Sequence, residues 1–328
     1  MRIEASAPSN IALIKYMGKV DSKKNSPCNS SLSYTLNHLR TFVSIEDNVS
    51  LEFDSWSSLD RKDLRRIDLS EKGRNKFLKH FSFLKEQLNI SEKFEIKSAN
   101  NFPSDCGLAS SASSFAALTL AAYQWALQAK KISIKDDGEL AMLSKMGSGS
   151  SCRSFYSPWV VWDAEGVKQI ELAENKLKHQ VVLCDESIKS VSSSDAHLRV
   201  LTSDLFIGRP ARAELRLNKL KEVLSSGKLI DSWRQAFEIC WNEFWDMHAL
   251  FHTSQPAFMY MNSGSQEVLT TILKIWNMEN DGPLVTMDAG SNIHLLYRKD
   301  QDELYSRLIK LFSTKYSVWT DEGYVAKV

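Results

Sequence analysis

Four short segments carry residues whose types and spacing suit chemistry on a phosphorylated, anionic substrate. The first is 101–117, NFPSDCGLASSASSFAA, in which a glycine turn opens a serine-rich, apolar run. A helix start leaves backbone N–H groups unpaired at the positive end of the helix dipole, and small residues let a phosphate approach them. The segment is therefore typical of a nucleotide-phosphate loop, although it lacks the Walker-type lysine. A small-residue helix packed on a sheet, with Ser110 as an ordinary N-cap, is the alternative.

Two further segments supply cations and hydroxyls. Residues 146–154 read MGSGSSCRS, a glycine-serine loop that ends near Arg153. Its hydroxyls could hold a phosphate or carboxylate, and the planar guanidinium offers a fork for an oxyanion; a flexible surface turn is the alternative. Residues 9–19 read SNIALIKYMGK, a strand-like run that ends in Lys15, Tyr16 and Lys19. These three side chains suit a polyanionic substrate, although lysines at a strand end are commonly only solvated.

An acid follows a β-type run in the fourth segment, 286–292, which reads TMDAGSN. Asp288 precedes a glycine turn, a position from which a carboxylate could act as a general base or orient a hydroxyl. A simple turn-forming aspartate is the alternative. The histidines predict no metal site, because His248 and His252 are four residues apart in HALFH but lack the glutamate of a zinc-protease helix.

Composition argues against several classes of protein. The 328 residues are 43% hydrophobic and carry 41 basic and 40 acidic side chains, a net charge of +1. This balance argues against a dedicated nucleic-acid or membrane-surface protein. Five scattered cysteines without a CxxC pair are typical of free thiols in a reducing compartment. With no secretory leader and no run of about 18 apolar residues, a cytoplasmic location is expected.

Helical and strand-like patterns alternate irregularly along the chain, which favours an α+β fold over a doubly wound parallel sheet. An aromatic stripe on 229–251 is interpreted as a helix face packed on a sheet. We place a domain boundary at 183/184, with 1–183 as the ATP-binding part and 184–328 as a C-terminal part. The predicted helices span 70–89, 108–127, 211–224, 229–251, 265–276 and 303–312. The predicted strands span 40–45, 51–53, 94–97, 157–162, 167–172, 180–184, 284–287, 293–297 and 317–319.

Together and in this order, the four segments resemble the mevalonate diphosphate decarboxylase family of the GHMP kinase superfamily. APSNIALIKYMGK is similar to the family's opening, which usually ends KYWGK, and GSGSSCRS differs at one position from the family's GSGSACRS. TMDAGSN resembles the terminal TxDAGPN, and NNFPSDCGLASSASSFAAL resembles the family's phosphate loop. NSPCNSSLSYTL, VSSSDAH and PAFMYMN also have counterparts, so the resemblance covers most of the chain.

The resemblance implies a GHMP kinase fold. Its N-terminal part would be like ribosomal protein S5 domain 2 and its C-terminal part ferredoxin-like, around a deep cleft. It also implies a reaction in which ATP with Mg²⁺ phosphorylates the tertiary hydroxyl of mevalonate diphosphate, after which loss of phosphate and CO₂ gives isopentenyl diphosphate. Because the family is commonly dimeric, a homodimer is expected.

The same resemblance assigns roles to residues of this chain. Asp288 would orient or deprotonate the hydroxyl, Arg153 would grip the substrate carboxylate, and Lys15 would tune Asp288. The residues implied for substrate binding are Tyr16, Lys19, Arg74, Ser148, Ser150 and Ser193. The residues implied for ATP are Gly107, Ser110, Ser111 and Ser113, with Mg²⁺ held through ATP and Ser111.

Several positions depart from the family pattern. Met17 replaces the usual tryptophan, Ser291 replaces proline, and 194–196 lack the usual glycine-methionine. Asp105 puts a negative charge close to the expected ATP phosphates. Because no proposed catalytic group is lost, a decarboxylase remains the preferred interpretation. Its alternatives are a decarboxylase of mevalonate phosphate, a mevalonate-type kinase that does not decarboxylate, and a catalytically idle nucleotide-binding paralogue.

Overall fold

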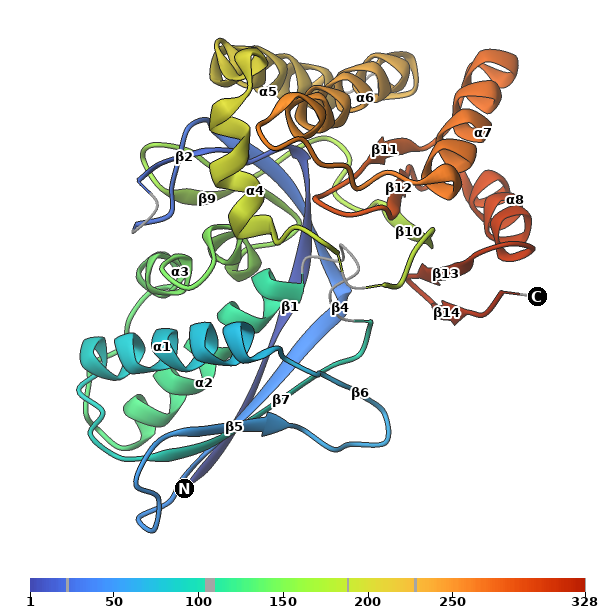
Figure 1. The fold of residues 1–328 in the computed structure, drawn as a ribbon. Helices are drawn as coiled ribbons and strands as arrows, with labels where there is room; N and C mark the ends of the chain where they lie inside the picture. Colours follow the sequence, from blue (N-terminus) through green and yellow to red (C-terminus); the bar gives the residue numbers. More distant parts are fainter. Residues whose placement is uncertain (22–23, 104–109, 188, 227–228, 328) are drawn as a thin grey trace.

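Two β-sheets organise the molecule, and helices cover them. The computed structural model describes residues 1–21, 24–103, 110–187, 189–226 and 229–327. Within these ranges the first half of the chain builds a seven-stranded sheet and the second half completes a five-stranded sheet (Figure 1). The mixture of sheets with unevenly spaced helices confirms the predicted α+β class.

The two longest strands, β1 (Arg2–Ile14) and β4 (Ser31–Asp47), form the antiparallel centre of the first sheet. β1 alternates between buried and more exposed residues as far as Pro8 and is buried continuously from Ser9 onward. Its register against β4 shifts between these two residues, where Pro8 has no N–H to donate to a ladder. The buried end of β1 therefore projects into the protein and delivers the residues that follow it to the interior.

The other strands of the first sheet flank this pair. The order is β5-β7-β4-β8-β9, with β1 also paired to β4 and β6 paired to β7. Their bounds are β5 (Ser55–Ser58), β6 (Arg65–Arg66), β7 (Phe94–Asn100), β8 (Trp159–Trp162) and β9 (Val167–Ile170). A separate two-stranded ribbon consists of β2 (Lys19–Asp21) and β3 (Ser26–Pro27).

Helices α1 (Glu71–Gln87) and α2 (Ser110–Gln128) pack together beside the first sheet. The next elements, α3 (Asp137–Lys145) and the 3₁₀ helix η1 (Gly149–Phe155), pack on α2. Small side chains let α2 lie close to β1 and β4, because a buried alanine keeps two backbones near each other. The buried alanines of α2 are Ala112, Ala116, Ala117, Ala121, Ala122 and Ala126.

The second sheet has the strand order β11-β12-β10-β13-β14 and is antiparallel throughout. Its strands are β10 (Lys178–Leu183), β11 (Leu284–Thr286), β12 (Ile293–Tyr297), β13 (Ser317–Thr320) and β14 (Gly323–Val325). Helices α7 (Ser263–Glu279) and α8 (Asp302–Ser313) contact this sheet. The chain passes from the first sheet to the second between β9 and β10. The domain boundary at 183/184 stays a prediction.

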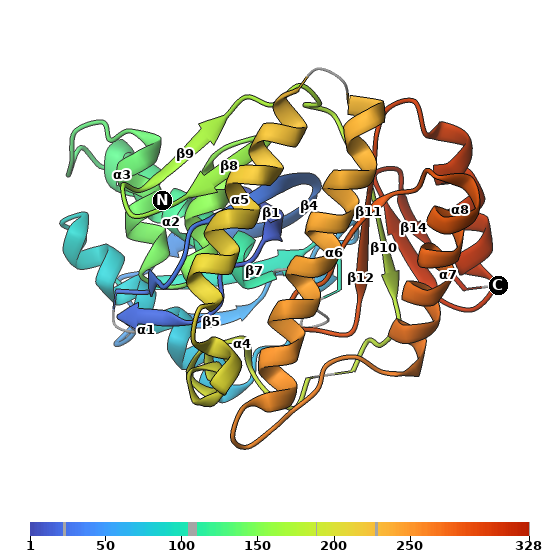
Figure 2. The same ribbon diagram turned by 90° about the horizontal axis from the view of Figure 1, so that it is seen from above.

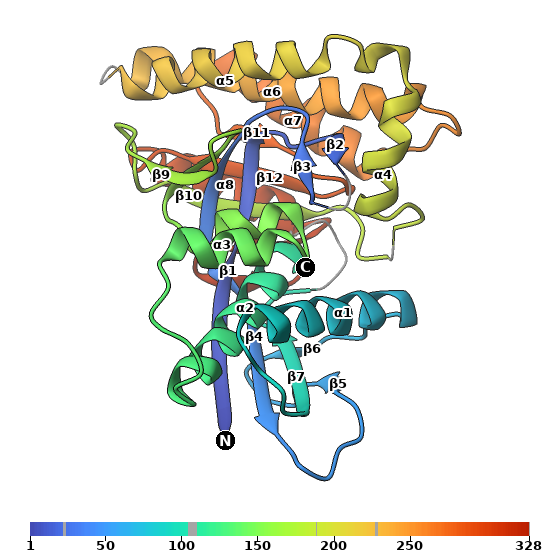
Figure 3. The same ribbon diagram turned by 90° about the vertical axis from the view of Figure 1, so that its left-hand side faces the viewer.

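Two long helices, α5 (Arg209–Ser225) and α6 (Leu229–Thr253), connect the sheets. They pack on each other and contact β1, while α6 also contacts β11 (Figures 2 and 3). The aromatic stripe of α6 is buried in the largest core cluster, which confirms its interpretation as a packing face. Between β10 and α5 lie α4 (Ser193–Arg199) and the 3₁₀ helices η2 (Val200–Thr202) and η3 (Asp204–Phe206).

Three local expectations differ from the structure. Residues 52 and 53 form a bend in which Glu52 and Phe53 are exposed, and the strand of this region is β5. The sequence MGSGSSCRS, read as a loop, contains η1, and the short helices α3 and α4 were not expected. Among the described residues, no helix is both long and apolar enough to cross a bilayer.

Removal of the Trp276 side chain should destabilise the second half strongly. Trp276 is buried, stacks on Phe237 with ring centroids 4.5 Å apart, and donates its indole N–H to the Pro283 carbonyl at 3.0 Å. We expect Trp276→Ala to lower the free energy of unfolding by about 3–5 kcal/mol, measured by urea denaturation. The matched control is Met278→Ala on the same helix, where the side chain is 84% exposed. Equal losses in the two variants would contradict this packing.

Candidate active site

A cavity of about 360 Å³ lies where the end of β1 meets the first turns of α1, α2, η1 and α4. It collects most of the residues that the sequence singled out. The predicted site residues that line it are Lys15, Tyr16, Lys19, Ser110, Ser111, Ser148, Ser150, Arg153, Ser193 and Asp288. Segments as distant in sequence as 15–19 and 288–289 therefore meet at one site.

An ion pair between a buried lysine and a partly buried aspartate forms one wall of this cavity. Lys15 directly follows β1, Asp288 follows β11, and Lys15 Nζ lies 2.7 Å from Asp288 Oδ1. Burial lowers the pKa of Lys15, although Asp288 opposes the shift. Burial acts to raise the pKa of Asp288, but the charge and hydrogen bond of Lys15 outweigh it, so that pKa is lowered overall. Each group keeps the other charged, which is the condition for two ions to share a buried site.

Helix α6 fixes the main chains of both partners. Glu243 Oε1 accepts a hydrogen bond from the Lys15 N–H at 3.0 Å. Five residues further along the helix, His248 Nε2–H donates to the Asp288 carbonyl at 3.3 Å. Burial lowers the pKa of His248 to about 3, so its ring is neutral at pH 7. One rigid helix thus sets the relative position of two residues that are 273 positions apart.

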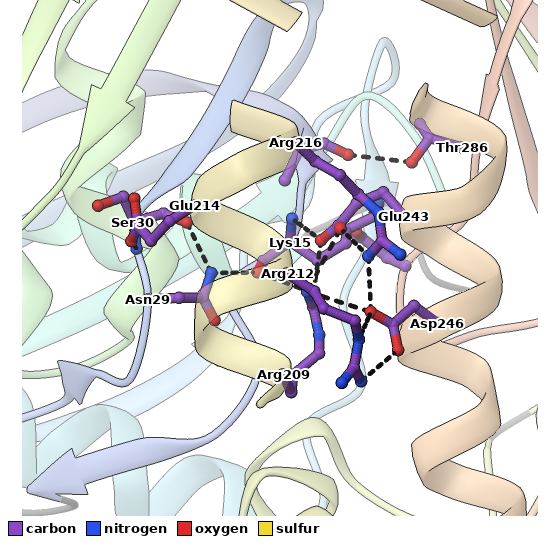
Figure 4. Close-up of polar contacts among 12 residues, drawn as sticks. Lys15, Asn29, Ser30, Arg209, Arg212, Glu214, Arg216, Glu243, Asp246 and Thr286 are labelled. Atoms are coloured by element: carbon purple, nitrogen blue, oxygen red, sulfur yellow. Dashed lines mark hydrogen bonds and ion pairs between the residues drawn. The ribbon is translucent and has the colours of Figure 1, made fainter. Parts of the chain in front are cut away.

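Glu243 belongs to a buried ionic network behind Lys15 (Figure 4). It accepts from Arg209 at 2.5 Å and from Arg216 at 2.9 Å, and both Glu243 and Arg209 are fully buried. Asp246, one turn along α6, also pairs with Arg216 at 2.6 Å. Burying charges is costly unless each has several partners. Glu243 satisfies this requirement with three donors, one of which is the Lys15 N–H.

Hydrogen bonds to two neighbouring side chains hold the Arg153 guanidinium in one orientation. Its Nε donates to Asn10 Oδ1 at 3.1 Å, and its Nη1 donates to Ser31 Oγ at 3.0 Å. The residue is 4% exposed and lines the cavity. Among the residues that the structure describes, no carboxylate forms an ion pair with its guanidinium. The guanidinium is fixed in this way, and its Nη2 has no hydrogen-bond partner among the residues that the structure describes. Such a group suits an incoming oxyanion.

Hydroxyl groups from two helix starts face the cavity. Ser110, Ser111 and Ser114 come from the first turns of α2, while Ser148 and Ser150 come from the start of η1. Ser148 Oγ lies 3.5 Å from the hydroxyls of Ser111 and Ser150, so the two starts adjoin. The N-terminus of a helix with free hydroxyls is a phosphate site. This placement agrees with a nucleotide-phosphate role for the first segment.

Of the residues predicted to contact ATP, Ser113 does not reach the cavity. Ser113 is fully buried, where its hydroxyl donates to the Ser110 carbonyl at 3.1 Å and lies 2.6 Å from Thr41 Oγ1. It does not line the cavity, because it points from α2 toward β4. Gly107 lies outside the described residues.

Gly149 shows why the second segment needs a glycine. A Cβ at this position would lie 2.7 Å from the Tyr16 ring, closer than side chains tolerate. The close approach lets Tyr16 pack between η1 and His197, whose ring centroid is 4.4 Å from that of Tyr16. His197 accepts the Gly18 N–H on Nδ1 at 3.1 Å, and burial lowers its pKa to about 3. The ring is therefore neutral at pH 7 with Nε2 protonated.

Lysines gather along another part of the cavity. Lys19 and, on α1, Lys72 and Lys76 all line it. Burial, and then the nearby charge of Lys76, lowers the pKa of Lys19 to about 8. Lys19 Nζ donates to Asn25 Oδ1 at 2.7 Å and makes no ion pair with a described carboxylate. Such a patch of cations favours a ligand with several negative charges.

Arg74 is not part of this lysine patch. Its guanidinium lies over the Trp56 ring, 5.7 Å from the centroid, and it does not line the cavity. Residues four apart share a helix face, whereas residues two apart do not. Lys72 and Lys76 therefore face the cavity together and Arg74, between them, faces elsewhere. In the sequence, this four-residue spacing favours Lys72 and Lys76 over Arg74 as residues that share one face of the helix.

Other residues in the cavity and behind it were not predicted. Lys189, Ser192 and His197 lie in a region whose motif singled out only Ser193. Glu243 sits within the aromatic stripe of α6 and gave no signal at all, because a single glutamate on a packing face has no periodic signature. Its role depends on a contact with a strand end more than 200 residues away.

Comparisons with known proteins agree with this geometry. The family model described as diphosphomevalonate decarboxylase-like N-terminal domain matches residues 7–172, and the mevalonate 5-diphosphate decarboxylase C-terminal domain matches residues 180–325. Diphosphomevalonate decarboxylase of Candida albicans is 31% identical, over 98% of this chain and 93% of the relative.

Solved structures are similar over the whole chain. A crystal structure of a mevalonate diphosphate decarboxylase from Legionella pneumophila aligns with a TM-score of 0.89 and 42% identity, covering 97% of this chain and 100% of that chain. The protein called MDDEF, solved in complex with MVAPP, AMPPCP and magnesium, aligns with a TM-score of 0.84 and 27% identity over 100% and 98% of the two chains. The predicted GHMP kinase fold is thereby confirmed. On the two family models and this near-complete coverage, the chain belongs to the diphosphomevalonate decarboxylase family.

Proposed function

We propose that this chain converts mevalonate 5-diphosphate, ATP and Mg²⁺ into isopentenyl diphosphate, CO₂, ADP and phosphate, a reaction of the mevalonate pathway. One observation carries the proposal: the Lys15–Asp288 ion pair lines the same cavity as Arg153. A kinase needs only a carboxylate near the acceptor hydroxyl. A decarboxylase also needs a cation fixed on the substrate carboxylate, and Arg153 provides it.

In the first step Asp288 aligns the tertiary hydroxyl for attack on the γ-phosphorus of ATP. The oxygen–phosphorus bond forms, the bond to ADP breaks, and the hydroxyl proton passes to the carboxylate. Because Lys15 lowers the pKa of Asp288, this group is a weak base, and its main contribution is orientation. That suits phosphoryl transfer, whose loose transition state needs the proton removed only late.

In the second step the new phosphate leaves the tertiary carbon with its bonding electrons. Positive charge develops on that carbon, and the electrons of the bond to the carboxylate then form the alkene as CO₂ departs. Arg153, held by Asn10 and Ser31, would keep the carboxylate in position for this elimination. A cavity walled by protein limits water, which would otherwise trap the cation.

The cavity fits a nucleotide and its metal. ATP supplies the transferred phosphoryl group, and Mg²⁺ bound to it reduces the negative charge of the phosphates. Ser110, Ser111 and Ser114 would contact the phosphates at the start of α2, with Ser111 as a metal ligand. Among the cavity-lining residues that the structure describes, only Asp288 has a carboxylate. The metal would therefore be bound chiefly through phosphates and hydroxyls.

The lysine patch supports a diphosphate as the remote group of the substrate. Lys19, Lys72 and Lys76 offer three cations, which match the charge of two phosphates better than one. Tyr16, Ser148, Ser150 and Ser193 complete the proposed substrate contacts. Arg74 would act only by adding positive potential from outside the cavity. The cytoplasmic location and the homodimer stay predictions.

Separate assays for ADP and CO₂ test the proposal. Purified protein is incubated with ATP, Mg²⁺ and either mevalonate diphosphate or mevalonate phosphate. We expect equal amounts of ADP and CO₂ from the diphosphate and a kcat/KM at least about tenfold lower for the monophosphate, since a charge partner is lost. ADP without CO₂ would indicate a kinase, a preference for the monophosphate would change the substrate, and no ADP from either would indicate an idle paralogue.

Substrate capture should weaken as the pH rises through about 8. Lys19 is charged below its pKa of about 8 and neutral above it, so its attraction for the diphosphate is lost in alkali. We expect kcat/KM, which reports the free enzyme, to fall above pH 8. Lys19→Arg should move this fall to higher pH, because arginine stays charged. The control is Lys97→Met, at a half-exposed lysine of β7 that does not line the cavity, and it should leave the profile unchanged. A Lys19→Arg profile identical to that of the original protein would contradict the assignment.

A further inference from the structure

A polar cluster lies outside the active-site cavity, at the junction of the two sheets. It consists of His38 on β4, His179 on β10, His294 on β12 and Asp321 in the turn between β13 and β14. One ligand atom from each of His38, His179 and Asp321 lies within 4.8 Å of the others. None of the four residues lines the cavity or takes part in the proposed reaction.

The ring of His179 is oriented by its neighbours. Its Nε2 lies 3.0 Å from His294 Nδ1, which leaves Nδ1 facing His38 Nε2, also at 3.0 Å. The His179 N–H donates to Asp321 Oδ2 at 2.7 Å, and Asp321 Oδ1 lies 3.2 Å from His38 Nδ1. Metal-binding histidines and carboxylates are characteristically oriented by such second contacts.

The contacts also allow the two facing nitrogens to bind a metal. His179 Nε2 faces His294 Nδ1 and His38 Nδ1 faces Asp321 Oδ1, so each ring in its neutral form can carry its proton on the outer nitrogen. His38 Nε2 and His179 Nδ1 are then both unprotonated, the form in which imidazole binds a metal. Without an ion between them, one of these two nitrogens donates to the other.

We propose that His38, His179 and Asp321 form a binding site for Zn²⁺, with water in the fourth position. Two imidazoles and a carboxylate are a donor set that zinc prefers, whereas Mg²⁺ prefers oxygen ligands alone. Bonds of about 2.0–2.1 Å to a tetrahedral ion set ligand nitrogens about 3.3–3.4 Å apart, close to the 3.0 Å between His38 Nε2 and His179 Nδ1. Asp321 Oδ1 lies nearest the other ring nitrogen of His38, Nδ1, so this carboxylate, whose side chain is one-third exposed, would turn to reach the ion, and solvent can supply the water.

Zinc at this position would link the first sheet to the second. His38 belongs to the first sheet, while His179 and Asp321 belong to the second. A ligand that binds only the folded protein stabilises it, and the stabilisation grows with the logarithm of its free concentration above the dissociation constant. Zn²⁺ should therefore raise the melting temperature, and this effect should depend on the ligands and not on catalytic turnover.

The test is a zinc titration of the metal-stripped full chain in excess Mg²⁺, with a chromophoric chelator as competitor and the melting temperature as a second readout. We expect one Zn²⁺ per chain and a rise in melting temperature. In His38→Asn and in Asp321→Asn the affinity should fall at least about tenfold and the thermal shift should disappear. His252→Asn, at an exposed histidine of α6, is the matched control and should behave as the original protein.

Two results would overturn the proposal. The first is the absence of a saturable zinc site, which would leave the cluster as a hydrogen-bonded chain of neutral histidines. The second is equal zinc affinity in His38→Asn, Asp321→Asn and the control, which would assign the ion to other groups such as the partly exposed thiols of Cys28 and Cys184. Circular dichroism of each variant confirms that it is folded, and the two ligand variants check each other.

Discussion

The ion pair between Lys15 and Asp288 is the interaction on which the rest of the site depends. Two opposite charges can share a buried position only if they are close and their remaining hydrogen-bond groups are satisfied. Lys15 meets this condition through Asp288 on its side chain and Glu243 on its main chain. The end of β1 and the end of β11 must therefore meet beside α6, and this requirement joins the two sheets into one catalytic unit.

Each kind of chemistry comes from a different structural source. Hydroxyls come from helix starts, where Ser111 and Ser148 adjoin. The fixed guanidinium of Arg153 comes from η1, braced by residues of β1 and β4. The lysine patch comes from α1 and the segment after β1. Phosphate transfer, carboxylate capture and diphosphate binding are thus spread around one cavity, so that a single bound substrate meets all three.

Three of the positions that depart from the family pattern have structural roles here, while Asp105 lies outside the described residues. Met17 is 3% exposed and fills a small core with Ala196 and Met247. The Ser291 carbonyl accepts from the Ser265 hydroxyl at 2.6 Å, and Asp195 accepts from the Ser192 hydroxyl at 2.7 Å. Each substitution is accommodated by packing or a hydrogen bond and leaves the Lys15–Asp288 pair in place.

Much of the fold and part of the site could be predicted from the sequence. Helices with a clear apolar period, such as α1 and α6, were predicted, because local pattern carries that information. Arg153 and Asp288 were singled out from residue type and resemblance, and both line the cavity; their roles stay predictions. Contacts between distant residues were not, as the support from Glu243 shows. Side-chain direction was also missed: Ser113 points into the core and Arg74 lies on Trp56, since both follow from packing that the residue types alone do not specify.

The most direct test of the central claim is the Asp288→Asn variant, which keeps the side-chain volume and removes the charge. ATP binding and the rate of ADP formation in a single turnover with mevalonate diphosphate are measured on the same preparation. We expect ATP affinity to stay within about threefold while ADP formation slows by about 10²–10⁴-fold. ADP formation at the original rate, or loss of ATP binding in the folded variant, would contradict it.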